Sequence, residues 1–461
     1  MPTPRFTRRR FVAGAAAFGA ALSSPWWAAP VAQERGTRPL VPREILFGDP
    51  DRAWARLSHD GAWLAYIAPV DGVRNLWVAP AADLSAAKPV TRATDRPIGS
   101  EYQWAYTNRH LVFAQDRDGD ENWRISSVDV TDGTVVPLTP PRGVRAHLQE
   151  MSRRHPSEML FGHNERDKRF FDLHRVNILT GRSELMFENH RYGWLITDSA
   201  FRLRLAVHYL GDGSFEWLEL RESGAWFSFL RVPISDVDGT EMLDFSDDGR
   251  TLYLLDSRGR DKAELVAIDM ATRRARVLAR DPEADLTTVV FQPAGRRPLA
   301  AGGMLDRRRW HAVDAAFTAD LERIRSATGG DADLRGLTLD GSKALAFIRH
   351  DDASSEYVVY DRPARKLHRL FKVRTRLHGL PLRPLEPVVF RARDGLTIRG
   401  YLTLPEPGAR QVPMVLAIHG GPYWRDEWGF NDTHQWLANR GYAVLSVNFR
   451  GSTGFGKAFV T

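Results

Sequence analysis

The sequence predicts an all-β region of repeated antiparallel strands over residues 40–380, followed by the beginning of an α/β domain over residues 381–461. Two observations predict the all-β region: tight-turn signals recur at intervals of 43 to 50 residues, and residues of alternating polarity flank them. A third predicts the α/β domain, because two continuous apolar runs separated by a short helical pattern replace the alternation near the end. A chain of 461 residues has room for both parts.

The first 32 residues are set apart from this fold because they have the composition of an export signal. The stretch Thr7-Arg8-Arg9-Arg10-Phe11 resembles a twin-arginine signal, and a mild Ala/Gly-rich apolar run follows as far as Ala29. This run is weaker and more interrupted than the roughly 20 apolar residues of a transmembrane helix. We expect cleavage between Ala29 and Ala32 and a periplasmic or secreted protein without a permanent membrane anchor. A basic, unfolded tail is the alternative.

Tight turns at seven positions divide residues 40–380 into repeats of similar length. The turns fall at Asp60, Asn108, His155, Asp198, Asp248, Ala294 and Asp340. Aspartate followed by glycine between alternating apolar residues, as at Asp60-Gly61, favours a hairpin, because glycine adopts positive φ without a Cβ clash. Several strands in each unit of roughly 40–50 residues are typical of β-propeller blades, so the sequence predicts a seven-bladed β-propeller. A β-sandwich is the alternative, but sandwiches rarely repeat at this length.

Two motifs in this region suggest metal sites but lack the required spacing. Residues 116–122, DRDGDEN, look like a calcium loop, but their glycine is in the fourth position, whereas the common helical calcium loop needs it in the sixth. His163 and His174 lie in an expected strand and have no metal-site spacing. We therefore predict a solvated or ion-paired turn at 116–122, two structural histidines, and neither a metal nor a cofactor.

Net charge and cysteine content exclude several classes of protein. The formal net charge is +7, but four of these charges belong to arginines of the export signal, which leaves about +3 for the remainder. So small an excess gives no reason to expect nucleic acid as a partner. The chain has no cysteine, which excludes disulfides, thiolate nucleophiles, cysteine-based zinc sites and a lipoprotein anchor. The oligomeric state stays open.

The pattern changes after residue 380. A linker is indicated by three prolines, Pro381, Pro384 and Pro387. A hairpin is then expected around Asp394-Gly395, and the apolar run VPMVLAI that follows is of the kind buried in a parallel sheet. A short helix over DTHQWLANRGY, closed by Gly441, and a second apolar strand over YAVLSVNFRG complete a βαβ unit.

The turn His419-Gly420-Gly421 follows the first strand of this unit and suggests a catalytic role. Acyl transfer develops negative charge on a carbonyl oxygen, and fixed backbone N–H groups lower the barrier by donating to it. Glycines let the backbone approach that oxygen closely, and α/β-hydrolases have such a His-Gly-Gly turn after an early strand. His419 is not expected to be the base, because the triad of that fold runs serine, aspartate, histidine along the chain. A plain tight turn between strand and helix is the alternative.

No serine of the sequence lies in a nucleophile elbow. The elbow requires Gly-x-Ser-x-Gly, and no window of the 461 residues has it. The nearest approach is Arg450-Gly451-Ser452-Thr453-Gly454, where arginine takes the place of the first glycine. Ser452 is therefore predicted to lie in a turn after a strand and not to be the nucleophile.

The whole pattern resembles the prolyl oligopeptidase family of serine peptidases, nearest its acylaminoacyl-peptidase and dipeptidyl-peptidase-like bacterial members. The resemblance rests on the repeats, on the loops DRDGDENWRI and NERDKRFFDLHRVNILTG, and above all on the run from His419 to Lys457. It implies a propeller that caps an α/β-hydrolase domain, a Ser-Asp-His triad, and the N–H of Gly421 as an oxyanion donor, in one turn with Gly420 and His419. Some relatives have a tyrosine in place of His419 and use its hydroxyl for the oxyanion. The triad is expected beyond Thr461, in a chain truncated before the catalytic serine. The sheet is then expected to be cut after its first strands, which leaves an exposed edge of apolar strands.

Three functions are compatible with these features. The favoured one is an exported serine peptidase that hydrolyses short peptides admitted by the propeller, with the 461-residue fragment itself inactive. The alternative is a non-catalytic propeller that binds peptides or proteins beside a degenerate hydrolase remnant. The third keeps hydrolase chemistry but acts on an ester; the propeller favours peptides, because a size-selecting cap suits a peptidase that must spare folded proteins. The preferred cleavage site, and the choice between endo- and exopeptidase, stay open.

Overall fold

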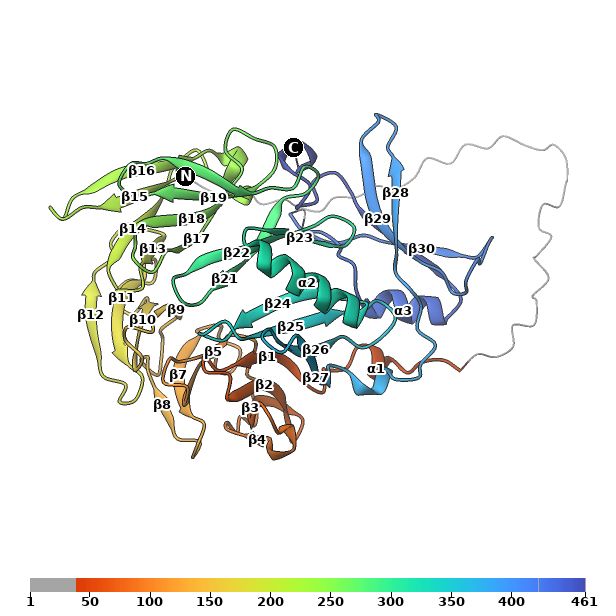
Figure 1. The fold of residues 1–461 in the computed structure, drawn as a ribbon, viewed down its shortest axis with the longest axis horizontal. Coiled ribbons are helices and arrows are strands. Elements are labelled where there is room, and N and C mark those ends of the chain that lie inside the picture. Colours follow the sequence, from red (N-terminus) through yellow and green to blue (C-terminus); the bar gives the residue numbers. More distant parts are fainter. Residues whose placement is uncertain (1–38, 422, 461) are drawn as a thin grey trace, which may run out of the picture. The chain divides into compact units, whose positions relative to one another are not determined.

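Most of the chain between Ala53 and Lys372 forms small antiparallel sheets, drawn in Figure 1. The computed structural model describes residues 39–421 and 423–460. The export signal predicted at residues 1–32 lies outside the described residues. Within them, no helix is both long enough and apolar enough to cross a membrane.

The described part of this region contains seven successive sheets, each built from strands that are consecutive in the chain. The first two consist of β1 (Ala53–Leu57), β2 (Trp63–Val70), β3 (Val73–Pro80) and β4 (Lys88–Pro89), then β5 (Tyr102–Trp104), β6 (His110–Gln115), β7 (Arg124–Asp129) and β8 (Val135–Pro137). The third and fourth consist of β9 (Ala146–Met151), β10 (Glu158–His163), β11 (Asp172–Asn177) and β12 (Ser183–Phe187), then β13 (Trp194–Thr197), β14 (Leu203–Tyr209), β15 (Phe215–Leu220) and β16 (Trp226–Val232). The fifth consists of β17 (Glu241–Phe245), β18 (Thr251–Asp256), β19 (Glu264–Asp269) and β20 (Ala275–Ala279). The sixth and seventh consist of β21 (Leu286–Gln292), β22 (Arg297–Met304) and β23 (Arg308–Ala312), then β24 (Asp331–Leu337), β25 (Lys343–Arg349), β26 (Glu356–Asp361) and β27 (Lys366–Lys372).

The seven turns predicted from the sequence each join the first two strands of one of these sheets. Three of them share one hydrogen-bonded motif, in which an aspartate accepts from the hydroxyl two residues earlier and from a backbone N–H two residues later. At Asp60 these donors are Ser58 Oγ, at 2.5 Å, and the Ala62 N–H, at 3.0 Å. Asp248 and Asp340 repeat the pattern. The glycine after each aspartate has φ of 69° or 70°, which explains why Asp-Gly recurs here.

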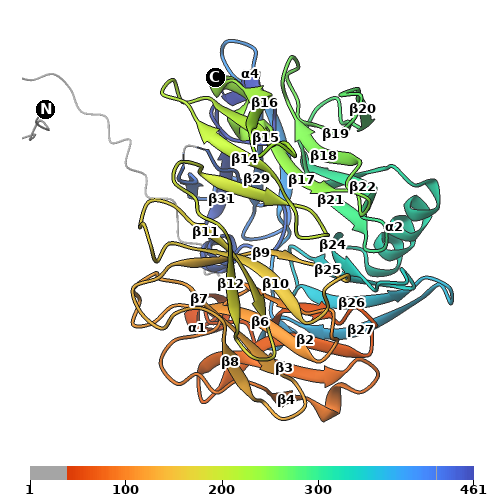
Figure 2. The same ribbon diagram turned by 90° about the vertical axis from the view of Figure 1, so that its left-hand side faces the viewer.

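The seven sheets form a closed ring, because an apolar cluster lies between each pair of neighbours, the seventh and first included. The cluster that joins the last sheet to the first packs Leu345 and Tyr357 against Leu64 and Tyr66. A backbone hydrogen bond of 2.7 Å from Leu339 N to His59 O joins the same two sheets. The other six junctions have clusters of the same kind. Figures 1 and 2 show the strands of the seventh sheet beside those of the first.

The sixth sheet has three strands, and a helix follows them. Helix α2 (Ala315–Thr328) begins after Asp314, whose side chain accepts from Ala316 N, and ends at Gly329 with φ of 72°. Phe317, Leu321 and Ile324 form its buried face, at the spacing of one helix face. The repeat pattern predicted only strands here, so this helix is an additional element.

After the ring, the chain forms an eighth, mixed sheet in the order β28 (Glu386–Arg391), β29 (Thr397–Thr403), β31 (Ala443–Asn448), β30 (Met414–Ala417). The hairpin around Asp394-Gly395 is confirmed, since β28 pairs antiparallel with β29. The βαβ unit is confirmed as well: β30 and β31 are parallel, and α3 (Asp432–Asn439) connects them. Gly441, with φ of 92°, follows the end of α3 as predicted. A last short helix is α4 (Lys457–Val460).

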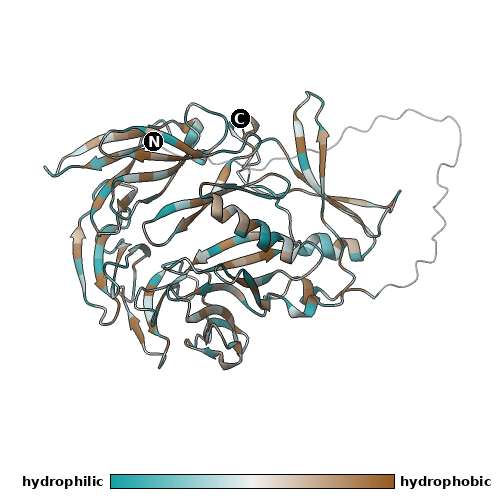
Figure 3. Cartoon of the chain, viewed as in Figure 1, coloured by the Kyte–Doolittle hydropathy of each residue, from teal (hydrophilic) through white to brown (hydrophobic). Residues whose placement is uncertain are grey.

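The run VPMVLAI, although of a kind usually buried in a parallel sheet, forms the exposed apolar edge that was expected here. Met414 is 58% exposed, Leu416 51% and Ile418 65%. The reason is the position of β30 at the edge of the sheet, where β31 is its one partner among the described strands. In contrast to this continuous apolar run, polar and apolar residues alternate along strands of the ring (Figure 3).

The segment before the ring packs against the part after it. Helix α1 (Arg43–Leu46) forms an apolar cluster with residues near α3, and Val41 N donates to Asn439 Oδ1 at 2.7 Å. These contacts join residues almost 400 positions apart. The segments before and after the ring thus pack together beside the eighth sheet.

Candidate active site

The turn His419-Gly420-Gly421 leaves β30 at its C-terminal end, and Gly421 is the residue that needs to be glycine. Its φ is 142°, and a Cβ added there would lie 2.8 Å from the backbone nitrogen of Tyr423. An added Cβ at Gly420 would meet no atom within 4 Å. Among the described residues, the N–H of Gly421 has no hydrogen-bond partner. Gly421 thus presents an exposed backbone donor, as an oxyanion turn requires.

The imidazole of His419 is fixed on both sides. Its Nδ1 lies 2.8 Å from Gly420 O, and its Nε2 lies 2.8 Å from Ser452 Oγ. A carbonyl oxygen only accepts, so Nδ1 carries a proton, and in the neutral ring Nε2 accepts from the serine hydroxyl. The ring also stacks on Phe449, with centroids 4.4 Å apart. His419 is therefore a residue that braces the turn.

Sequence reasoning did not pair His419 with Ser452, which are 33 residues apart. A serine hydroxyl at 2.8 Å from an imidazole has the geometry of an activated nucleophile. However, Ser452 is fully buried, and its N–H donates to Phe449 O at 2.9 Å. A substrate cannot reach the hydroxyl without movement of this loop, so the contact serves to orient His419.

The carboxylate of Asp426 lies near His419. Burial raises the pKa of Asp426, and the charges of His419 and Arg425 oppose this shift. Its backbone is clamped by Asn448, since Asp426 N donates to Asn448 Oδ1 at 2.8 Å and Asn448 Nδ2 donates to Asp426 O at 3.1 Å. Its Oδ2 is buried and has no hydrogen-bond partner within the described part of the chain. A carboxylate is thereby held in place next to the turn.

A cavity of about 930 Å³ lies between the ring and the residues that follow the turn. Its wall on the ring side comes from the connection before β17, including Ile234, and from the first residues of β17 and β21, including Glu241 and Thr287. The opposite wall comes from residues 423–427 and 453–460. Tyr423 and Trp424 are 61% and 66% exposed. A cavity with exposed aromatic side chains next to backbone donors suits a peptide.

Two cationic side chains that line this cavity, Arg425 and Lys457, form hydrogen bonds between its two walls. Arg425 donates to Met304 O at 2.6 Å and to Leu305 O at 2.8 Å, and burial lowers its pKa. Lys457 Nζ donates to Asp236 Oδ1 at 2.6 Å. Each of these bonds links the C-terminal segment to the ring. They fix the turn and the cavity relative to each other.

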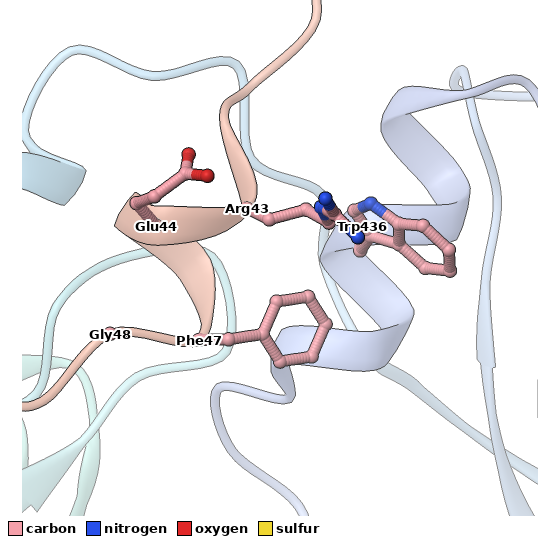
Figure 4. Close-up of a pocket in the computed structure, with 5 residues that line it drawn as sticks. All are labelled: Arg43, Glu44, Phe47, Gly48 and Trp436. Carbon is pink, nitrogen blue, oxygen red and sulfur yellow. The ribbon is translucent and has the colours of Figure 1, made fainter.

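A second cavity, of about 660 Å³, lies where α1 meets α3 and is drawn in Figure 4. Phe47 and Trp436 form its apolar wall, with ring centroids 6.1 Å apart in edge-on contact. Figure 4 shows the side chain of Arg43 directed toward Trp436 and that of Glu44 directed away from it. Its five lining residues bring no nucleophile to it, and we assign it to the packing of the two helices.

The motif at residues 116–122 forms an ion-paired turn, as predicted. Asp116 is buried and pairs with Arg96 at 2.6 Å, and Asp120 pairs with Arg124 at 2.6 Å. Asp118 is exposed. Within residues 39–421 and 423–460, no group of three or more His, Cys, Asp or Glu side chains is placed to hold a metal ion.

The two histidines singled out by the sequence lie on neighbouring strands. His163 ends β10, His174 lies in β11, and their rings stack with centroids 4.0 Å apart. Burial, together with the charge of His163, lowers the pKa of His174 to about 4. Two stacked neutral rings are the structural histidines that were predicted.

Comparison with known proteins identifies relatives along most of the chain. No family model matches it. Dipeptidyl aminopeptidase BIII of Pseudoxanthomonas mexicana is 40% identical over 443 residues, which cover 94% of this chain and 64% of the relative. Dipeptidyl peptidase family member 6 of Caenorhabditis elegans is 29% identical, with 91% of this chain and 62% of the relative covered. The chain thus spans less than two thirds of the length of these curated relatives.

Solved structures show the same fold at low sequence identity. A prolyl endopeptidase structure has a TM-score of 0.67 at 13% identity, over 91% of this chain and 64% of its own. A puromycin-hydrolyzing peptidase of Mycobacterium tuberculosis has a TM-score of 0.65 at 16% identity, over 92% of this chain and 71% of its own. The ring and these structural neighbours together define a propeller-type fold. More specifically, the homologues of the chain are dipeptidyl peptidases, and its structural neighbours are peptidases of the prolyl oligopeptidase family.

Proposed function

We propose that the protein is an exported serine peptidase that hydrolyses short peptides. In this proposal, residues 1–32 are the export signal, residues 40–380 are a seven-bladed propeller, and residues 381–461 begin the α/β-hydrolase domain. The propeller limits access to the cavity lined by residues 423–427, which follow the turn at 419–421. Peptide hydrolysis follows the Ser-Asp-His mechanism, in which the serine attacks the carbonyl carbon and backbone N–H groups stabilise the oxyanion.

The observation that carries the proposal is the N–H of Gly421, exposed and without a partner in the described part of the chain, two residues before Tyr423, which lines a cavity of about 930 Å³. Its φ of 142° and the position of an added Cβ explain why this residue is glycine. Gly420 and His419 hold the turn, and Gly421 donates to the oxyanion. Residues of the ring supply half of the cavity wall, so a bound peptide contacts both parts of the chain.

We propose further that the triad lies in the part of the family's length that this chain does not span. No window of the sequence has Gly-x-Ser-x-Gly, and Ser452 is fully buried in its contact with His419. The 461 residues alone are then inactive. The names of the two curated relatives support the release of dipeptides from the amino ends of peptides as the specific activity.

The experiment is to express the complete reading frame and measure hydrolysis of dipeptidyl-aminocoumarin substrates with a free or an acetylated amino end. The proposal predicts cleavage of the free substrates, and at least about 100-fold slower cleavage of the acetylated ones. Equal cleavage of both would replace the dipeptidyl activity by an endopeptidase or acylpeptidase activity. No hydrolysis of any peptide, with retained peptide binding, would instead establish the non-catalytic propeller.

A further inference from the structure

Three charged side chains meet in the middle of the ring. Arg296 Nη2 donates to Glu150 Oε1 at 2.5 Å and to Met151 O at 3.0 Å, while its Nη1 donates to Asp244 Oδ1 at 3.0 Å. The side chains of Arg296 and Glu150 are each 13% exposed, and that of Asp244 is 27% exposed. Both terminal nitrogens of the guanidinium thus donate hydrogen bonds to carboxylates that are largely shielded from water.

Of the three sheets that supply these partners, the fifth and sixth are neighbours, and the third is a neighbour of neither. Glu150 lies in β9 of the third sheet, Asp244 in β17 of the fifth, and Arg296 in the turn between β21 and β22 of the sixth. In a ring of seven, the third and sixth sheets are separated by at least two others on either side. The contact between Arg296 and Glu150 therefore crosses the centre of the ring.

The backbone aims these side chains inward at all three positions. In β9 one extra residue precedes Glu150, and in β17 one extra residue precedes Asp244, as the register of each strand with its neighbour shows. Such bulges turn the next side chain away from its regular direction. Arg296 has φ of 49°, a conformation uncommon for a residue with a side chain.

The crossing lies at the end of the ring away from the C-terminal segment. Glu241, at the start of β17, lines the large cavity, and Asp244 is three residues further along the same strand, or about 10 Å at the rise of a β-strand. Just beyond it, Asp247 binds Arg153 at 2.6 Å and Ser199 at 3.1 Å, so turns of the third, fourth and fifth sheets also converge here. The cavity is at one end of β17 and the crossing at the other.

We infer that Arg296 is a tie across the ring, which holds the third, fifth and sixth sheets together from the inside and closes the centre at this end. The large cavity then opens only toward the C-terminal segment, and a ligand enters and leaves by that side. This inference does not depend on the proposed peptidase activity, because it concerns the ring alone.

The test is hydrogen exchange of the protein with Arg296→Met, at pH 8.5. This pH is chosen because burial raises the pKa of Glu150 to about 7 against the opposing charge of Arg296, and Glu150 is then ionised. Loss of a tie that spans three sheets raises exchange in β9, β17 and β21 together, by about tenfold. The matched control is Arg166→Met, whose bidentate ion pair with Asp172 stays within the third sheet.

Faster exchange confined to β21 and β22 would overturn the inference. That result is expected if Arg296 stabilises only its own sheet. If Arg296→Met does not fold, Glu150→Gln is the milder variant. It loosens β9 and β21 while β17 stays protected through Asp244, and equal protection of all three strands would contradict the tie.

Closure of the centre can be tested separately by the reactivity of one introduced cysteine. Because the chain has no cysteine of its own, any thiol reaction comes from the introduced residue. Tyr106 is half-buried beside the tie, and the charges of both Arg296 and Glu150 influence its pKa, which burial raises. The thiol of Tyr106→Cys should react with a maleimide about tenfold faster when Arg296 is replaced by Met. Equal rates in the two backgrounds would show that Arg296 does not cover the centre.

Discussion

Burial of His434 makes the C-terminal βαβ unit sensitive to acid. The imidazole is 1% exposed, between Thr403 Oγ1 at 2.9 Å and Ser446 Oγ at 2.7 Å. Burial lowers its pKa from 6.5 to about 4. Because the folded pKa lies below the unfolded one, the unfolded chain binds the proton more readily between these values, and stability is lost as the pH falls below 6.5. Between pH 8 and pH 5 the loss from this residue is about 2 kcal/mol.

The assay is urea unfolding of the protein and of His434→Gln at pH 8 and pH 5. Glutamine keeps hydrogen-bonding groups for both hydroxyls but does not titrate, so the variant should lose about 2 kcal/mol less than the wild type over this interval. Groups that titrate elsewhere, such as His174, act equally in both proteins and cancel in the comparison. The same loss in both would refute the assignment of the buried, neutral His434.

Three further predictions concern the candidate site. In the complete protein, Gly421→Ala should lower kcat/KM for peptide hydrolysis by about 100-fold or more, because the added Cβ lies 2.8 Å from Tyr423 N and displaces the oxyanion donor. The control Gly420→Ala should keep kcat/KM within about threefold. Equal effects of the two substitutions would contradict the role of Gly421. Arg425→Met should lower the free energy of unfolding by about 2–4 kcal/mol, measured in urea, since two carbonyls of the ring lose their buried donor. Ser452→Ala should keep peptide hydrolysis within about tenfold, because the serine only orients His419, and complete loss would make it the nucleophile.

The sequence predicted those features that are determined by neighbouring residues. All seven turns of the ring were located, since a turn such as Asp60-Gly61 is determined by its own side chain and by the positive φ of its glycine. The βαβ unit and the turn at Gly421 followed from the same kind of local pattern.

Features that depend on distant contacts were missed. The contact of His419 with Ser452 joins residues 33 positions apart, and that of Arg296 with Glu150 joins residues 146 apart, without a motif at either end. A glycine turn such as that at Gly421 is therefore readable from a sequence, whereas the contacts that position it need the fold.

The most direct measurement of the central proposal is labelling with a fluorophosphonate probe, which reacts with an activated serine, followed by mass spectrometry of the labelled peptide. The account predicts stoichiometric labelling of the complete reading frame at a serine in a Gly-x-Ser-x-Gly window beyond residue 461, and no labelling of the 461-residue chain. Stoichiometric labelling of the 461-residue chain at Ser452 would contradict it.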